Sequence, residues 1–102
     1  MVYNKLVRDR IPAIIESKGQ SPNIWILSGE ESTVALEQKL DEEVSEYHKD
    51  KNLEELADIL EVVYALSENL GHSKEELLET CEKKHRERGG FRDRIFLISN
   101  EG

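Results

Sequence analysis

Four carboxylates interrupt the apolar patterns of two consecutive helix-like stretches, and they are the side chains best suited to chemistry. Glu43 and Glu46 stand three residues apart in EEVSEY, residues 42–47, and Glu55 and Asp58 repeat that spacing in the next stretch. A carboxylate taken out of water costs several kcal/mol unless a cation or hydrogen-bond donors meet it. Because Glu43 borders an apolar stripe, the sequence predicts a positive group beside it.

A helical hairpin is the structure that would position these carboxylates. Apolar residues at helical spacing predict one helix over about residues 31–49 and a second over about 53–70. Asn52 is suited to cap the second helix, and Gly71 is suited to end it. Since the turn between the helices is short, they should run antiparallel.

In an antiparallel hairpin, residues equally distant from the turn lie side by side. Glu46 should therefore face Glu55, and Glu43 should face Asp58, with the two levels about 4.5 Å apart along the axis. Four anions this close repel one another unless a cation binds them. Oxygen ligands without Cys or paired His favour Mg²⁺ or Mn²⁺.

These acidic residues also have a plain structural interpretation. Glu55 could reach back to cap the helix that follows Asn52. The other acids could be solvated charges that pair with nearby lysines. The side chains concerned are Glu42, Glu46 and Asp58, with Lys39, Lys49 and Lys51. A di-iron centre is a further rival, because such bundles use Glu-x-x-His motifs and Glu82 to His85 supplies one.

Two further helices are predicted on either side of the hairpin. The first covers about residues 11–18, and the last begins after Ser73 and ends at Gly89-Gly90. Glu76 stands three residues after Ser73 and completes a capping box. The expected fold class is therefore mainly α, with the helical hairpin as its core.

Two short apolar segments lie outside these helices, at residues 23–27 and 94–99. Both are too short for helices and rich in β-prone residues, so they could pair as a small two-stranded ribbon. Trp25 lies in the first segment and Phe91 precedes the second. Each is expected in the core, with stacking on a base as the alternative.

The predicted helix over residues 53–70 is apolar around more than half of its circumference, with a narrow polar strip through Glu54, Glu61 and Glu68. One neighbouring helix cannot cover so wide an apolar surface. A second subunit is therefore expected, as a homodimer or a dimer of dimers.

Length, charge and cysteine content limit the classes of function. The 102 residues fit one domain over residues 1–102. The net charge of −8 argues against nucleic-acid binding, which depends on neutralised phosphates. No apolar run approaches a membrane span and the start of the chain lacks a secretory signal, so a cytoplasmic location without a membrane partner is expected. Cys81 stands alone and is expected to be a plain thiol.

The acidic residues and two further segments resemble a known family. EEVSE (42–46) followed by ELAD (55–58) is similar to the E-E-x-x-E and E-x-x-D signature of the all-α nucleoside triphosphate pyrophosphohydrolase superfamily, which includes the MazG-like enzymes and phosphoribosyl-ATP pyrophosphohydrolase. YNKLVRDRIP (3–12) and KKHRERGGF (83–91) look like a small MazG-related subgroup, so the resemblance covers nearly the whole chain. It implies a MazG-like four-helix arrangement formed on dimerisation.

The resemblance implies Mg²⁺-dependent cleavage of a nucleoside triphosphate between its α and β phosphates, which gives the monophosphate and pyrophosphate. By this resemblance Glu43, Glu46, Glu55 and Asp58 bind the metal, and Glu42 is a supporting or water-orienting carboxylate. Eight residues separate Glu46 from Glu55, fewer than is usual in the family, yet the facing relation of the four carboxylates survives the shortening.

Such a reaction also needs a base for the attacking water and positive charge around the phosphates. The expected catalytic set is Glu42, Glu43 and Glu46. The two ends of the chain are basic while its middle is acidic, which suits a site that binds metal and phosphate together. The substrate-binding candidates are Lys5 and Arg8 near the start, and Lys84 and Arg88 in the last helix. Interaction with the helix dipole is the alternative role of the last two.

Three functions remain open from the sequence. The first is hydrolysis of a nucleotide substrate, with the clearing of damaged nucleotides as one open role. The second is a metal-dependent nucleotide-binding or interaction module without catalysis. The third is a purely structural helical dimer whose acids are solvated.

Overall fold

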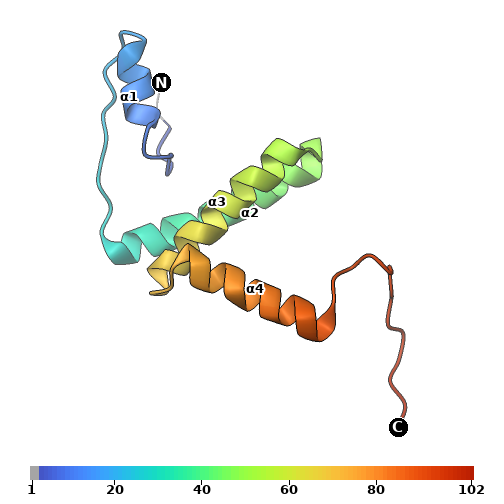
Figure 1. The fold of residues 1–102 in the computed structure, drawn as a ribbon. Coiled ribbons are helices and arrows are strands. Elements are labelled where there is room, and N and C mark those ends of the chain that lie inside the picture. Colours follow the sequence, from blue (N-terminus) through green and yellow to red (C-terminus); the bar gives the residue numbers. More distant parts are fainter. Residues whose placement is uncertain (1–2) are drawn as a thin grey trace.

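The computed structural model describes residues 3–102 and contains four α-helices (Figure 1). They are α1 (Ile11–Ser17), α2 (Gly29–Asp50), α3 (Leu53–Asn69) and α4 (Lys74–Arg88). No strand occurs within residues 3–102. The predicted mainly α fold class is confirmed, and each helix begins and ends within two residues of its predicted position.

Side-chain caps explain where the three longer helices begin. Ser28 Oγ accepts a hydrogen bond from the Glu31 N–H at 3.2 Å, and the Glu31 carboxylate accepts one from the Ser28 N–H at 3.0 Å. Ser73 and Glu76 form the same reciprocal capping box ahead of α4. Asn52 Oδ1 accepts a backbone N–H of the first turn of α3. Each cap satisfies backbone donors that the helix start leaves without a partner.

Helices α2 and α3 form the predicted antiparallel hairpin (Figure 1). Lys51 makes the turn in a left-handed conformation, with φ of 48°, and its N–H donates to the Tyr47 carbonyl at 2.8 Å. All the buried residues within the described range belong to these two helices: they are Leu36, Glu43, Val62 and Ser67. The hairpin therefore carries the small core of the chain.

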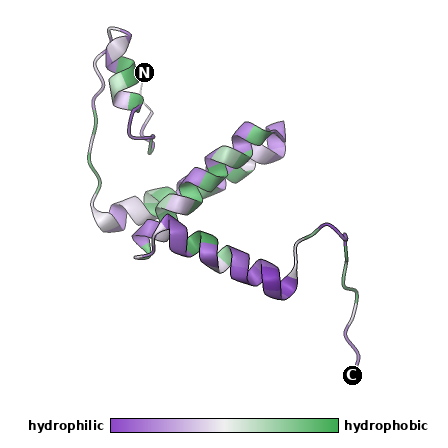
Figure 2. Cartoon of the chain, in the orientation of Figure 1, coloured by the Kyte–Doolittle hydropathy of each residue, from purple (hydrophilic) through white to green (hydrophobic). Residues whose placement is uncertain are grey.

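Helix α4 leaves the hairpin at its open end, away from the turn at Lys51 (Figure 1). The Ser67 hydroxyl donates to the His72 carbonyl at 3.2 Å and fixes this corner. Hydrophilic residues cover most of α4 (Figure 2), and none of its residues is buried. Among the described residues, no helix combines the length and the apolar content needed to cross a membrane.

The expected ribbon of residues 23–27 and 94–99 is not formed within the described chain. The first segment leads from α1 into α2, whereas the second follows α4 and lies at the opposite end of the molecule (Figure 1). Since α4 directs the chain away from the hairpin, the two segments do not meet in this structure. Trp25 and Phe91, expected in the core, are also exposed.

The wide apolar surface of α3 is only partly covered within the described chain. Leu53, Leu56 and Leu60 of α3 remain exposed, as do Leu70, which directly follows the helix, and Val44 of α2. Helix α4 contacts only part of α3, so no third helix shields the hairpin along its length.

Candidate metal centre

The hairpin brings the four predicted carboxylates into two overlapping groups. Oxygens of Glu43, Glu55 and Asp58 lie within 4.8 Å of one another, and oxygens of Glu46, Asp50 and Glu55 form a second group by the same measure. Glu55 belongs to both groups. The expected facing pairs, Glu46 with Glu55 and Glu43 with Asp58, each fall within one group.

The acidic neighbours act directly on Glu55. Desolvation by partial burial raises the pKa of the Glu55 carboxyl, and repulsion from Asp50, Asp58, Glu46 and Glu43 raises it further. All four neighbours belong to the two groups that share Glu55, so negative charge gathers around this one carboxylate. A divalent cation would relieve that repulsion.

Glu55 does not cap its own helix, which was one alternative reading of its position. Glu31 and Glu76 stand at the same position in their helices, and each accepts the backbone N–H of its N-cap residue. Within residues 3–102, no such bond joins the Glu55 carboxylate to Asn52. The Glu55 side chain is therefore free to turn toward the acids of α2.

Lys39 is the positive group that the position of Glu43 requires. Its Nζ lies 3.3 Å from Glu43 Oε1 and 3.6 Å from Glu42 Oε1. The side chains of Lys39 and Glu43 are only 19% and 11% exposed, so this pair is largely withdrawn from water. Sequence reasoning named Lys39 only as a partner of solvated acids. The spacing of one helical turn between Lys39 and Glu43 was the available signal.

Arg8 connects the start of the chain to the hairpin. Its Nη2 donates to Asp58 Oδ1 at 2.7 Å, and its Nη1 lies 3.6 Å from Glu61 Oε1. The Arg8 side chain remains 55% exposed, so part of the guanidinium faces solvent. One of the four substrate-binding candidates thus lies at the edge of the carboxylate groups.

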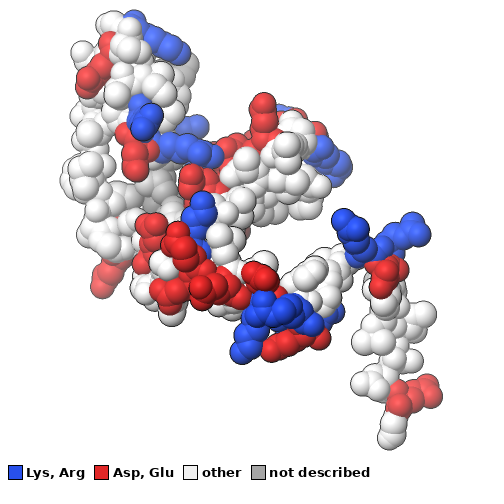
Figure 3. Space-filling view, viewed as in Figure 1, with Lys and Arg blue, Asp and Glu red and all other residues white. Residues whose placement is uncertain are grey.

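The other three substrate-binding candidates form no ion pair with the carboxylates of the two groups within the described chain. Lys5 is exposed, with its Nζ 5.9 Å from the centre of the Tyr3 ring. Lys84 and Arg88 are exposed on α4, and basic side chains gather over the end of that helix, remote from the hairpin turn (Figure 3). Within the described chain, neither of them forms an ion pair with a carboxylate of the two groups.

The structure adds Asp50 to the predicted carboxylates. It gives no support to the alternative of a di-iron centre. Asp50 follows Glu46 by one helical turn and closes the second group, a signal present in the spacing. Glu82 pairs with Arg86 at 3.1 Å, and neither Glu82 nor His85 belongs to a metal-ligating group within residues 3–102.

The donor set fits a hard divalent cation. Mg²⁺ binds oxygen at about 2.1 Å, so two oxygens on opposite sides of the ion lie about 4.2 Å apart. The oxygens of each group all lie within 4.8 Å of one another, a spread that such an ion can bridge after small side-chain rotations. Every donor is a carboxylate oxygen, and neither Cys nor His takes part. This chemistry suits Mg²⁺ or Mn²⁺.

Comparison with known proteins gives one partial match. No family model matches this chain, and no solved structure matches it. An uncharacterized protein of Mycolicibacterium smegmatis is 55% identical over 42 residues, which cover 41% of this chain and 43% of that protein. Since the match spans less than half of either chain, it establishes neither a family nor a function.

Proposed function

We propose that this protein is a nucleoside triphosphate pyrophosphohydrolase, which uses Mg²⁺ to cleave a nucleotide between its α and β phosphates. The products are the nucleoside monophosphate and pyrophosphate. The observation that carries the proposal is the convergence of carboxylates from α2 and α3 on Glu55. The segments that resemble MazG-like enzymes supply the reaction class.

The metal would be held by Glu43, Glu55 and Asp58, with Glu46 and Asp50 on the side toward the turn. When bound, Mg²⁺ neutralises phosphate charge and lowers the pKa of a water ligand. Arg8 stands beside Asp58 and has N–H groups facing solvent, so it can donate to a phosphate oxygen. A guanidinium placed there would orient the triphosphate at the edge of the site.

Glu42 is the proposed proton acceptor for the attacking water. Its side chain is about half exposed, and it lies next to the largely buried pair of Lys39 and Glu43. Lys39 holds Glu43 in place and leaves Glu42 with a single long contact at 3.6 Å. A carboxylate that is not engaged elsewhere can accept a proton.

The remaining phosphate contacts would come from a second copy of the chain. Within the described chain, Lys84 and Arg88 form no ion pair with the carboxylates of the two groups, so we assign their role in binding phosphate to a homodimer or a dimer of dimers. The substrate and Mg²⁺ are both abundant in the cytoplasm, where we place the protein.

A panel of nucleoside triphosphates tests the proposal. Purified protein should release pyrophosphate, and not inorganic phosphate, from at least one of them when Mg²⁺ is present, and EDTA should abolish the release. Absence of pyrophosphate from every nucleotide at high protein concentration would contradict the proposal.

A second candidate function is nucleotide binding without turnover. Lys39 and Arg8 already pair with Glu43 and Asp58, so part of the acidic charge is balanced without a metal. This balance favours a module in which a nucleotide and its metal bind but no bond is cleaved. Calorimetry with the same nucleotides distinguishes the two, because such a module would show saturable heat without product.

A further inference from the structure

The chain exposes far more surface than a compact monomer of its size. Its accessible surface is 9516 Å², whereas a folded monomer of this mass exposes about 5,900 Å². Its radius of gyration is 18.1 Å, against about 13 Å for a compact domain of the same length. The excess exceeds the roughly 1,000–2,500 Å² that each partner contributes to most large permanent interfaces. An interface formed by one helical face alone would therefore not bury the excess accessible surface.

Two extended segments contribute strongly to this excess. Residues 95–98 carry four consecutive apolar side chains, of which Phe96 and Ile98 are each 89% exposed. Within residues 23–27, Trp25 and Ile26 are 81% and 83% exposed. Burying large apolar side chains of this kind favours association. Apolar residues on both faces are typical of a strand that is covered on both sides.

Both segments also have free backbone groups. Within the part of the chain that the structure describes, no backbone hydrogen bond involves residues 23–27 or residues 95–98. An extended segment with unpaired N–H and C=O groups is a template for pairing with another strand. Each segment can satisfy the groups of the other, but the two lie far apart in the single chain (Figure 1).

We propose that two copies of this chain exchange their C-terminal segments. Residues 95–98 of each copy pair as a β-strand with residues 23–27 of the other, and the exchange is reciprocal about a two-fold axis. A symmetric dimer satisfies both segments of both copies at once, and it leaves no strand free for further association. The ribbon expected from the sequence then forms between chains.

Charge sets the direction of this pairing. The C-terminal segment is preceded by Arg92, Asp93 and Arg94, which together carry one net positive charge, and residues 23–27 are followed by Glu30 and Glu31 at the start of α2. An antiparallel arrangement places these two basic residues beside the two acidic ones. A parallel arrangement separates them by the length of the strand.

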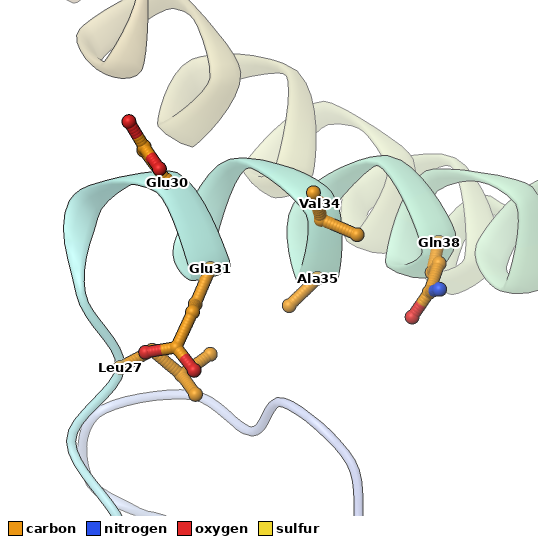
Figure 4. A pocket seen from close by; sticks show the side chains of 6 residues that line it. All are labelled: Leu27, Glu30, Glu31, Val34, Ala35 and Gln38. Atoms are coloured by element: carbon orange, nitrogen blue, oxygen red, sulfur yellow. The ribbon is translucent and has the colours of Figure 1, made fainter.

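A hollow on α2 supports the same direction. Leu27, Val34 and Ala35 line a shallow hollow of about 390 Å³ together with Glu30, Glu31 and Gln38 (Figure 4). In an antiparallel pair, the residues that precede the C-terminal strand run toward this hollow. Phe91, which is 97% exposed in the single chain, is the apolar side chain that reaches it.

Photocrosslinking tests the exchange without assuming a register. p-Benzoylphenylalanine replaces Phe96, and equal amounts of unlabelled and heavy-nitrogen-labelled protein are refolded together and irradiated. The expected crosslinks join residue 96 to residues 20–38, and they include peptide pairs of mixed isotopes in the statistical proportion. Crosslinks confined to pairs of one isotope, or capture of other segments only, would overturn the proposal.

A matched pair of charge variants tests the contribution of the strand to association. Ile98→Asp should weaken the dimer at least about tenfold, because a charge enters the buried ribbon. Ser99→Asp adds the same charge one residue later and should change the dissociation constant less than about threefold. Sedimentation equilibrium measures both, and circular dichroism verifies that the helices persist. Equal dimer affinity for the two variants, or a monomeric wild-type chain, contradicts the exchange.

Discussion

The hairpin and the two chain ends differ in whether their acidic or apolar side chains find partners within the chain. In the hairpin, Glu43 is buried and meets Lys39, and Asp58 meets Arg8, so two of the acidic groups find partners within one chain. At the ends, Trp25 and Phe96 are apolar and find none within the described residues. In our proposals the hairpin holds the metal and the substrate, and the ends pair with a second copy of the chain. The predictions below test this division, beginning with the largest expected effect.

Loss of Glu55 should have the largest effect on activity. Glu55→Gln removes one charge from both carboxylate groups, and we expect pyrophosphate release to fall at least about 100-fold. Glu68→Gln is the matched control, because Glu68 is exposed on the same helix and lies outside both groups. Activity of Glu55→Gln equal to that of the control would exclude the hairpin as the active site.

Loss of Lys39 should destabilise the metal-free hairpin. Lys39→Met leaves the Glu43 carboxylate largely buried without its cation, which should lower the free energy of unfolding by about 1–3 kcal/mol. Mg²⁺ should then raise the melting temperature of this variant more than that of the wild type, since the ion replaces the missing charge. Lys49→Met, exposed on the same helix, serves as the control. An unchanged melting curve would show that Glu43 does not depend on Lys39.

Loss of Arg8 should affect substrate binding more than stability. The ion pair of Arg8 with Asp58 is half exposed, so Arg8→Ala should lower the free energy of unfolding by at most about 1 kcal/mol. The loss of a charge-assisted contact to phosphate should raise KM about tenfold or more. Arg10→Ala is the control two residues away. A large loss of stability with unchanged KM would make Arg8 a structural residue.

Glu55 should make a small contribution to the pH dependence of stability, and its direction can be predicted. Its pKa is raised in the folded chain, so this group favours folding while protonated, and the contribution is lost as the pH rises through the raised pKa. Glu55→Gln should therefore increase the melting temperature of the metal-free protein near neutral pH, and the difference should shrink toward acidic pH. Thermal melts in EDTA across that range measure it. A melting-temperature difference between the variant and the wild type that grows on acidification would contradict this prediction.

The helices, which depend on local sequence, could be predicted, and so could the proximity of the carboxylates of α2 and α3. Caps at Asn52 and Ser73 and glycine stops fix the helix boundaries through short-range backbone chemistry. The short turn fixes which residues of α2 and α3 face one another, so Glu46 and Glu55 could be paired from their distances to it. Asp50 and Lys39 follow from the same helical spacing, but their roles depend on side-chain directions that spacing alone does not give.

The arrangement of the ends was not predictable from local patterns. Residues 23–27 and 94–99 have the composition of strands, yet the direction of α4 keeps them apart. Trp25 and Phe91 were expected in the core because large aromatic side chains are usually buried, but the single chain leaves both exposed. Only three-dimensional placement shows this exposure.

Titration of the metal-free protein with Mn²⁺, followed by calorimetry or electron paramagnetic resonance, tests the central claim most directly. We predict saturable binding by the wild type and by Glu68→Gln, competed by Mg²⁺ and lost in Glu55→Gln. Absence of binding by the wild type, or equal binding by Glu55→Gln, would contradict a metal centre in the α2–α3 hairpin.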